Sequence, residues 1–309
     1  MVDLTGIATL DVVEVERLFA DTPAEELVAG VRDLDDDALW ALVNRDETRP
    51  VAVAGILARL HEYAVPAMLA RVEGRVRLEL DRRGKVLETH VLSCSGGVLT
   101  LSDDVAPVDV TLRTSVVRFV RLISGEHNAG LEYLSGHLDI DGDADLALAV
   151  GGMFRVPGSD EVAVDPRALD PVDVARALGE VDSRHLKKVM ASGFRPVVLG
   201  EIFRRLPQFV DQRKAGTTRL DVGFRLLGNP SGEVERYHVS IDRGAATVSP
   251  GEEGQRRDAT ISCEGHDFLR LATGHLNPVA GVLKGTLKVK GDKAKALHFS
   301  SLIDFPRAG

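Results

Sequence analysis

The stretch Leu283–Leu297, "LKGTLKVKGDKAKAL", has a counterpart earlier in the chain at Leu134–Leu148, "LSGHLDIDGDADLAL". Both stretches run through leucine, glycine, alternating apolar positions, Gly-Asp, alanine and leucine. Their charges are opposite, because Lys288 and Lys290 replace two aspartates of the earlier stretch. The alternation is typical of a half-buried β-strand, and Gly-Asp is typical of the turn that ends it.

The two stretches belong to a longer internal repeat. At an offset of 149 residues the match needs no gap from Asp109 to Leu148, and upstream the offset falls to 146 or 147. A self-match of this length predicts a tandem duplication. The join lies near Val156–Pro171, which is rich in turn residues. We therefore expect two domains, residues 1–165 and residues 166–309.

Each copy is expected to be an α+β domain. Helical periodicity opens the copy, and alternating segments such as Arg75–Leu80 follow, broken by glycines. Thr22–Glu25 is interpreted as a capping box, and Asp35 and Asp182 as equivalent helix N-caps. A further helix, the stretch that includes Leu134–Leu148 or Leu283–Leu297, and a closing apolar segment complete each copy. This order predicts a largely antiparallel sheet covered on one face by helices.

Composition narrows the class of protein. The 309 residues are 44% apolar and carry a formal net charge of −9, which argues against general nucleic-acid binding. Two cysteines make no disulfide framework, and the N-terminus lacks the pattern of a signal peptide. No apolar run is long enough to span a membrane. We expect a cytoplasmic protein, and the high glycine, alanine, valine and arginine content suggests a bacterial source.

Signals of enzymatic activity are weak. No phosphate-binding loop, dinucleotide fingerprint, or zinc-protease or serine-hydrolase motif is present. Cys94 lies on an expected strand and is interpreted as an inert thiol. The stretch "DIDGDADL" offers four aspartates to a calcium ion, but its counterpart carries lysines, so a metal site is not expected. We predict that the chain is not an enzyme.

The second copy resembles the sterol carrier protein type two family. The stretch "DATISCEGHDFLRLATGHLNPVAGVLKGTLKVKGDKAKAL" follows that family's signature of Asp-x-Thr, Asp-Phe, Gly, Asn-Pro and Gly-x-Leu-x-Val-x-Gly-Asp. The matching residues are Asp258, Thr260, Asp267, Phe268, Gly274, Asn277, Pro278, Gly285, Leu287, Val289, Gly291 and Asp292. The first copy departs from the pattern at Arg118 and Ala129, so we predict that the second copy binds ligand more tightly.

The resemblance implies a curved sheet with an apolar tunnel beneath its helices, and no cofactor. Such modules bind sterols, fatty acids or fatty acyl-CoA and transfer or present them. No catalytic or metal-binding residue is carried over. Some apolar residues are expected to contact the ligand, because of their position in the motifs and in the apolar periodicity; packing in the core is the alternative. These residues are Phe268, Leu271, Leu283, Leu297, Phe299, Leu302, Ile303 and Phe305 in the second copy, and Phe119, Leu122, Tyr133, Leu134, Leu148, Met153 and Phe154 in the first copy. The alternative function is a scaffold or accessory subunit of a lipid-metabolising enzyme.

The two copies differ strongly in charge. Residues 1–165 contain 15 basic and 30 acidic residues, whereas residues 166–309 contain 23 and 17. Three interpretations remain: two solvated faces, transient contact of the basic copy with an anionic membrane, and docking between copies within the chain or in a homodimer. Between the last two, docking is favoured here, because the acidic copy would be repelled from anionic lipid.

Overall fold

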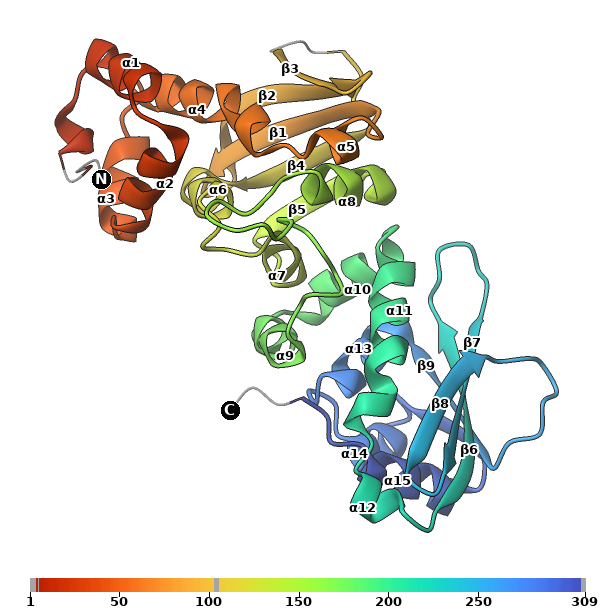
Figure 1. Cartoon of the computed structure of the whole chain (residues 1–309). Coiled ribbons are helices and arrows are strands. Elements are labelled where there is room, and N and C mark those ends of the chain that lie inside the picture. Colours follow the sequence, from red (N-terminus) through yellow and green to blue (C-terminus); the bar gives the residue numbers. More distant parts are fainter. Residues whose placement is uncertain (1–3, 5, 103–105, 307–309) are drawn as a thin grey trace. The chain divides into compact units, whose positions relative to one another are not determined.

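The structure is a computed structural model that describes Leu4, residues 6–102 and residues 106–306. It divides the chain into two compact units, Met1–Asp165 and Pro166–Gly309 (Figure 1).

The first unit combines a five-stranded sheet with helices. Its strands are β1 (Gly74–Arg82), β2 (Lys85–Ser95), β3 (Val98–Ser102), β4 (Val110–Ser115) and β5 (Leu138–Gly142). Its helices are the 3-10 helices η1 (Ile7–Thr9) and η2 (Leu60–Tyr63), and α1 (Val12–Asp21), α2 (Ala24–Arg32), α3 (Asp36–Val43), α4 (Arg49–Ala58), α5 (Pro66–Leu69), α6 (Val116–Ile123), α7 (Ala129–Leu134) and α8 (Ala144–Gly152).

The second unit repeats this arrangement. Its strands are β6 (Arg219–Leu227), β7 (Glu235–Asp242), β8 (Ala245–Pro250), β9 (Ala259–Glu264) and β10 (Lys288–Gly291). Its helices are α9 (Pro171–Gly179), α10 (Ser183–Ala191), α11 (Arg195–Arg205), the 3-10 helix η3 (Leu206–Phe209), α12 (Gln212–Ala215), α13 (Gly265–Ala272), α14 (Pro278–Leu283) and α15 (Lys293–Leu302).

Both sheets have the same strand order, β3-β2-β1-β4-β5 in the first unit and β8-β7-β6-β9-β10 in the second. Adjacent strands are antiparallel except at the central pairs, β1 with β4 and β6 with β9, which are parallel. The predicted α+β class with a largely antiparallel sheet is therefore confirmed. The alternation in β1 explains why helices cover one face: Val76, Leu78 and Leu80 are buried, whereas the residues between them are half-buried.

The leading helices belong to the repeat. At the upstream offset of 147, α2 corresponds to α9 and α3 to α10. Asp35 accepts a hydrogen bond from the Ala38 amide and Asp182 from the His185 amide, each at 2.8 Å, so both predicted N-caps are confirmed. The predicted capping box at Thr22–Glu25 is wrong. Helix α2 begins after Pro23, which has no side-chain acceptor, so no side chain caps it.

The capping box of the first unit lies instead at the start of α1. The Asp11 carboxylate accepts from the Glu14 amide at 2.9 Å, and the Glu14 carboxylate accepts from the Asp11 amide at 2.8 Å. Helix α1 and η1 have no counterpart in the second unit, because residues 156–170 are described and contain no helix. The first unit therefore carries an additional helical segment at its N-terminal end.

A buried arginine anchors the long helix to the sheet in each unit. Arg195, at the start of α11, is 2% exposed, and its Nε donates to Glu235 of β7 at 2.8 Å. Its other donors reach Glu235 again and the carbonyls of Met190, Leu227 and Gly228. In the first unit, Arg49 makes the equivalent contact, and its Nε donates to Glu88 of β2 at 2.8 Å.

Candidate functional site

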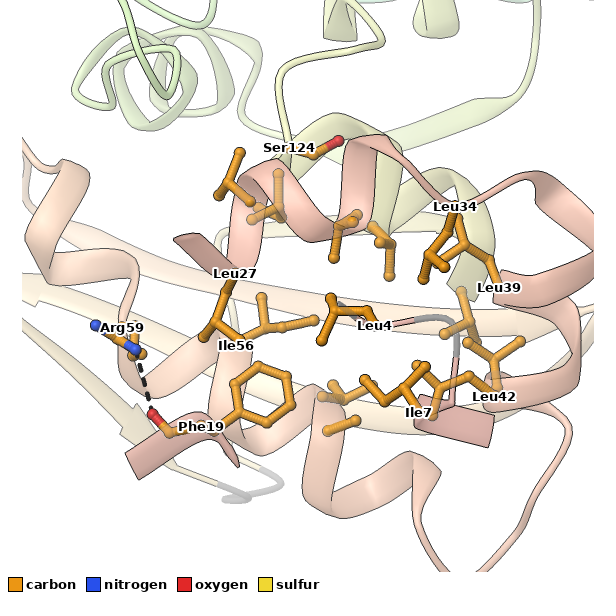
Figure 2. Close-up of a pocket in the computed structure, with 18 of the residues that line it drawn as sticks. Leu4, Ile7, Phe19, Leu27, Leu34, Leu39, Leu42, Ile56, Arg59 and Ser124 are labelled. Atoms are coloured by element: carbon orange, nitrogen blue, oxygen red, sulfur yellow. Dashed lines mark hydrogen bonds between the residues drawn. The ribbon is translucent and has the colours of Figure 1, made fainter. Parts of the chain in front are cut away.

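An apolar cavity of about 80 Å³ lies in the first unit, between its helices (Figure 2). One wall comes from α4, η2 and α6, and the other from Leu4, η1 and α1–α3. The lining residues are Leu4, Ile7, Phe19, Ala24, Leu27, Val28, Val31, Leu34, Leu39, Leu42, Val43, Arg49, Ala52, Val53, Ile56, Arg59, Leu60, Tyr63, Val116, Val120, Ile123 and Ser124. No strand contributes to it, so this cavity is not the predicted tunnel between sheet and helices.

The lining includes short side chains of α4. Ala52 lines the cavity, whereas its counterpart in α11 at the offset of 146 is the larger Val198. Gly55 allows α1 to approach closely, since a Cβ atom there would lie 2.7 Å from Cγ of Phe19. The counterpart of this glycine is Glu201, which instead pairs with arginines on the surface of α11. The space beneath α1 is thus a feature of the first unit.

Polar groups occur at the edge of the cavity. Arg59 donates from Nη1 to the carbonyl oxygen of Phe19 at 3.2 Å (Figure 2). It also donates to the carbonyl oxygen of Thr22, so Arg59 joins α1 to the end of α4. Burial, with the nearby carboxylate of Glu25, raises the pKa of Tyr63 to about 12. The Tyr63 hydroxyl therefore stays protonated at neutral pH, and the cavity can hold an apolar group beside one neutral hydroxyl.

The interior of the second unit is occupied by aromatic rings. Phe203 of α11 stacks on Tyr237 of β7 with ring centroids 3.7 Å apart, and on Phe268 of α13 at 4.9 Å. Phe224 of β6 meets Phe268 edge-on at 5.4 Å and Phe299 of α15 at 5.8 Å. Helices and sheet are joined here by direct ring contacts, which leave little room between them.

At four of the five matching positions, the first unit carries a smaller or polar side chain. The aligned residues are Leu57, Leu78, His90, Phe119 and Val150, so one ring of the five is conserved between units. The described residues of the first unit include an apolar cluster around α3, α4 and α6 and another around α5 and α8, and Leu99, Leu112 and Phe154 pack against both. Among the described residues, the apolar cavity of Figure 2 therefore lies in the first unit, and tighter ligand binding by the second copy stays a prediction.

The expected ligand-contact residues are divided between interior and surface. In the second unit, Phe268, Leu271, Phe299, Leu302 and Ile303 are buried and Phe305 is half-buried. In the first unit, Phe119, Tyr133, Leu134 and Met153 are buried, and Leu122, Leu148 and Phe154 are half-buried. None of these residues lines the described cavity. Phe268 and Phe299 meet in the ring cluster, and Phe119 and Met153 belong to different apolar clusters.

Two of the expected residues lie on the surface. Leu283 at the end of α14 is 83% exposed, and Leu297 on α15 is 40% exposed. Neither side chain can form the wall of an enclosed tunnel in this conformation. Sequence reasoning missed the lining of α2–α4, because the quoted family motifs start downstream of these helices. The small residues of "PVAVAGILARL" were the available signal.

Other reactive side chains are accounted for locally. Cys94 and Cys263 are both buried, and burial raises the pKa of each thiol, to about 12 for Cys263. Asp143 caps α8, and Asp139 lies 3.8 Å from Arg113. In the part of the chain that the structure describes, no group of three or more His, Cys, Asp or Glu side chains is arranged to hold a metal ion.

A second cavity, of about 290 Å³, opens beside α10 and the start of α13. Its lining includes four charged or titratable side chains, Lys187, Arg195, Glu264 and His266, together with Met190, Ala191 and two glycines. Burial lowers the pKa of His266, and the donors of Arg195 are already taken within the protein. This second cavity does not match the apolar ligands that the resemblance implies.

Comparisons with known proteins agree with the repeated fold. A family model described as the SCP-2 sterol transfer family matches residues 54–155 and again residues 222–304. The chain is 29% identical to Hydroxysteroid dehydrogenase-like protein 2 of Xenopus tropicalis over 105 residues, which are 34% of this chain and 24% of that protein. It is also 29% identical to Sterol carrier protein 2 of Homo sapiens over 115 residues, 36% of this chain and 20% of that protein.

Among solved structures, Sterol Carrier Protein 2 from Yarrowia lipolytica in its apo form is similar at 22% identity with a TM-score of 0.28. The match covers 35% of this chain and 95% of that one. The two curated relatives named above are matched over 24% and 20% of their length. Over the described residues, no helix has both the length and the apolar character needed to cross a bilayer.

Proposed function

The chain belongs to the SCP-2 sterol transfer family, and from this premise we propose that it is a non-catalytic carrier whose first unit binds the apolar part of a lipid. The observation that carries the proposal is the cavity beneath α1–α3, because its exposed lining is almost entirely apolar. Sterols, fatty acids and fatty acyl groups are the ligand classes that suit such a lining. The buried, protonated thiols of both cysteines support a role without covalent chemistry.

Energetics favour an apolar ligand at this position. Each methylene group removed from water contributes about 0.8 kcal/mol, and an apolar cavity offers water no hydrogen-bond partners. A cavity of about 80 Å³ is small beside the roughly 150 Å³ engineered cavity that accepts benzene. A long acyl chain or a sterol therefore requires α1 and α2 to move outward from α4 and α6. We propose that the contact of Arg59 with Phe19 and Thr22 opens when such a ligand enters.

Native mass spectrometry of the purified chain, together with titration of a fluorescent fatty acid, tests this proposal. Ala52→Leu fills part of the cavity and should weaken binding about tenfold. Ile56→Ala enlarges the cavity and should preserve or strengthen binding. The positional control is Val198→Leu, which places the same leucine at the equivalent position of α11, although it adds one carbon where Ala52→Leu adds three, and it should bind like the parent.

The results separate the alternatives clearly. Retained lipid in the parent, its loss in Ala52→Leu and its retention in Val198→Leu would support the proposed site. Binding that weakens only with Val198→Leu would transfer the site to the second unit. A parent chain that retains no lipid and binds no fatty acid would overturn the carrier function and favour a scaffold role beside a lipid-metabolising enzyme.

A further inference from the structure

The second unit presents apolar side chains to solvent on two adjacent helices. Val279 and Leu283 lie four residues apart on α14 and are 51% and 83% exposed, and Leu297 of α15 is 40% exposed. Helix α14 contacts α15, and α15 contacts the edge strand β10. We call the surface formed by α14, the turn after it, β10 and α15 the lysine face. Single exposed apolar residues are ordinary, whereas a group with a polar rim marks an interaction site.

Lysines surround these apolar side chains. Lys284, Lys288, Lys290 and Lys293 are all exposed. Within the described ranges, the structure has no ion pair for any of these four lysines. Lys295 differs, because its ammonium group pairs with Asp258. In the described part of the chain, the lysine face therefore carries four lysines without an ion pair, and the one exposed carboxylate among them, Asp292, caps α15.

The first unit shows that the fold does not require this surface. At the offset of 149, Gly130 replaces Val279, and the counterpart of Leu283 is Leu134, which is only 7% exposed. Asp139 and Asp141 occupy the positions of Lys288 and Lys290 on the equivalent strand. The exposed leucine and the unpaired lysines are thus properties of the second unit alone, and its core does not need them.

We propose that the lysine face docks the protein on an anionic lipid bilayer. Lysines near the surface are attracted to acidic headgroups, while an exposed leucine and valine can enter the boundary between headgroups and acyl chains. The composition argues against a protein partner, including the copy-to-copy docking that charge alone favoured, since protein interfaces are enriched in arginine and aromatic residues and depleted in lysine. Helices α14 and α15 and strand β10 contain no arginine, and their one phenylalanine, Phe299, is buried.

This inference goes beyond lipid binding in the first unit and does not depend on that cavity. It also gives a physical reason for the opposite charges of the repeated stretch. In the first unit, the surface that corresponds to the lysine face is acidic and is therefore repelled by anionic headgroups. The chain can thus contact a membrane through the lysine face alone. A carrier that contacts a membrane in a fixed orientation would exchange ligand there, but docking itself requires no ligand.

Flotation of the full chain with phosphatidylcholine vesicles, with and without phosphatidylserine, tests the proposal. The parent should float only with vesicles that contain phosphatidylserine, and less as salt rises. Lys288→Gln combined with Lys290→Gln should lower partitioning about thirty-fold, because each lysine contributes roughly a fivefold factor. Leu283→Ser should lower it about tenfold. Since Leu283 is 83% exposed, that variant should keep the parent's melting temperature.

The matched control is Arg184→Gln combined with Lys187→Gln on α10, which removes the same charge from exposed positions elsewhere in the second unit. It should float like the parent. A fluorophore on a Leu283→Cys variant should shift to the blue with phosphatidylserine vesicles. Equal loss of binding in the control and the Lys288/Lys290 variant would overturn the assigned face, as would binding that ignores phosphatidylserine.

Salt-sensitive dimerisation without vesicle binding would overturn the membrane proposal and assign the face to a second copy of the chain. The lipid retained in native mass spectra should be the same in the parent and the Leu283→Ser variant. Failure of docking and failure of the proposed carrier function are therefore distinguishable, because they appear in separate measurements.

Discussion

Replacement of Arg195 by leucine is expected to destabilise the second unit and to leave the first unit unchanged. The side chain is 2% exposed, and it joins the start of α11 to Glu235 of β7 and to the carbonyls of Met190, Leu227 and Gly228. Leucine fills part of the volume but donates no hydrogen bond. The variant therefore leaves a carboxylate and several carbonyl groups without their donor in a poorly hydrated site.

The expected loss follows from that geometry. Removal of one partner of a buried ion pair costs about 3–5 kcal/mol of unfolding free energy, because the other charge stays buried without compensation. Glu235 is 21% exposed, so water can relieve part of the cost and we expect the lower end of that range. At roughly 3 °C per kcal/mol for a unit of this size, the melting temperature of the second unit should fall by about 10 °C.

Two measurements separate the units. Trp40 is the single tryptophan of the chain and lies on α3, so its fluorescence follows unfolding of the first unit, whereas calorimetry follows both. The Arg195→Leu variant should move one calorimetric transition and leave the Trp40 transition in place. The matched variant Arg49→Leu should do the reverse, because that arginine makes the same contact to Glu88.

Two outcomes would refute this reasoning. A shift of less than about 3 °C would mean that the buried ion pair contributes less than its geometry implies. A Trp40 transition that moves together with the calorimetric one in the Arg195→Leu variant would mean that the two units unfold as one body. The conservative variant Arg195→Lys keeps the charge without the planar fork, and should fall between leucine and the parent.

Three further predictions concern pH, reactivity and organisation. A hydrogen bond from Lys295 holds the pKa of Asp258 below its ordinary value, so the ionised Asp258 stabilises the fold above about pH 4 and this contribution is lost as pH falls further. Asp258→Asn should therefore lower the melting temperature near pH 7 but not near pH 2. An equal shift at both pH values would contradict this. Cys94 and Cys263 should resist thiol reagents near pH 8 until the chain is denatured, and rapid labelling of the native protein would count against their inert role. Limited trypsin treatment should cut first after the exposed Arg167, at the start of the second unit, whereas a first cut within either sheet would disprove two separately folding domains.

Much of the architecture could be predicted from the repeated sequence. Two copies with the same order of apolar alternation, helical periodicity and glycine turns must fold alike, because those patterns act locally and identically in each copy. The same strand order in both sheets and the N-caps at Asp35 and Asp182 confirm this. The predicted capping box at Thr22 is wrong, because Thr22 ends α1 and Pro23, which has no side-chain acceptor, takes the N-cap position of α2.

The sequence by itself determined which positions correspond, and only the tertiary structure decided which side chains meet. Leu134 and Leu283 align within the repeat, yet one is 7% and the other 83% exposed, because burial depends on what neighbouring elements place above a residue. Phe203, Phe224 and Tyr237 come from three elements, and no local pattern indicates that Phe203 contacts the other two rings. The cavity beneath α1 is also decided by tertiary packing. Its size depends on how closely two helical layers pack around small side chains, and no single segment determines that.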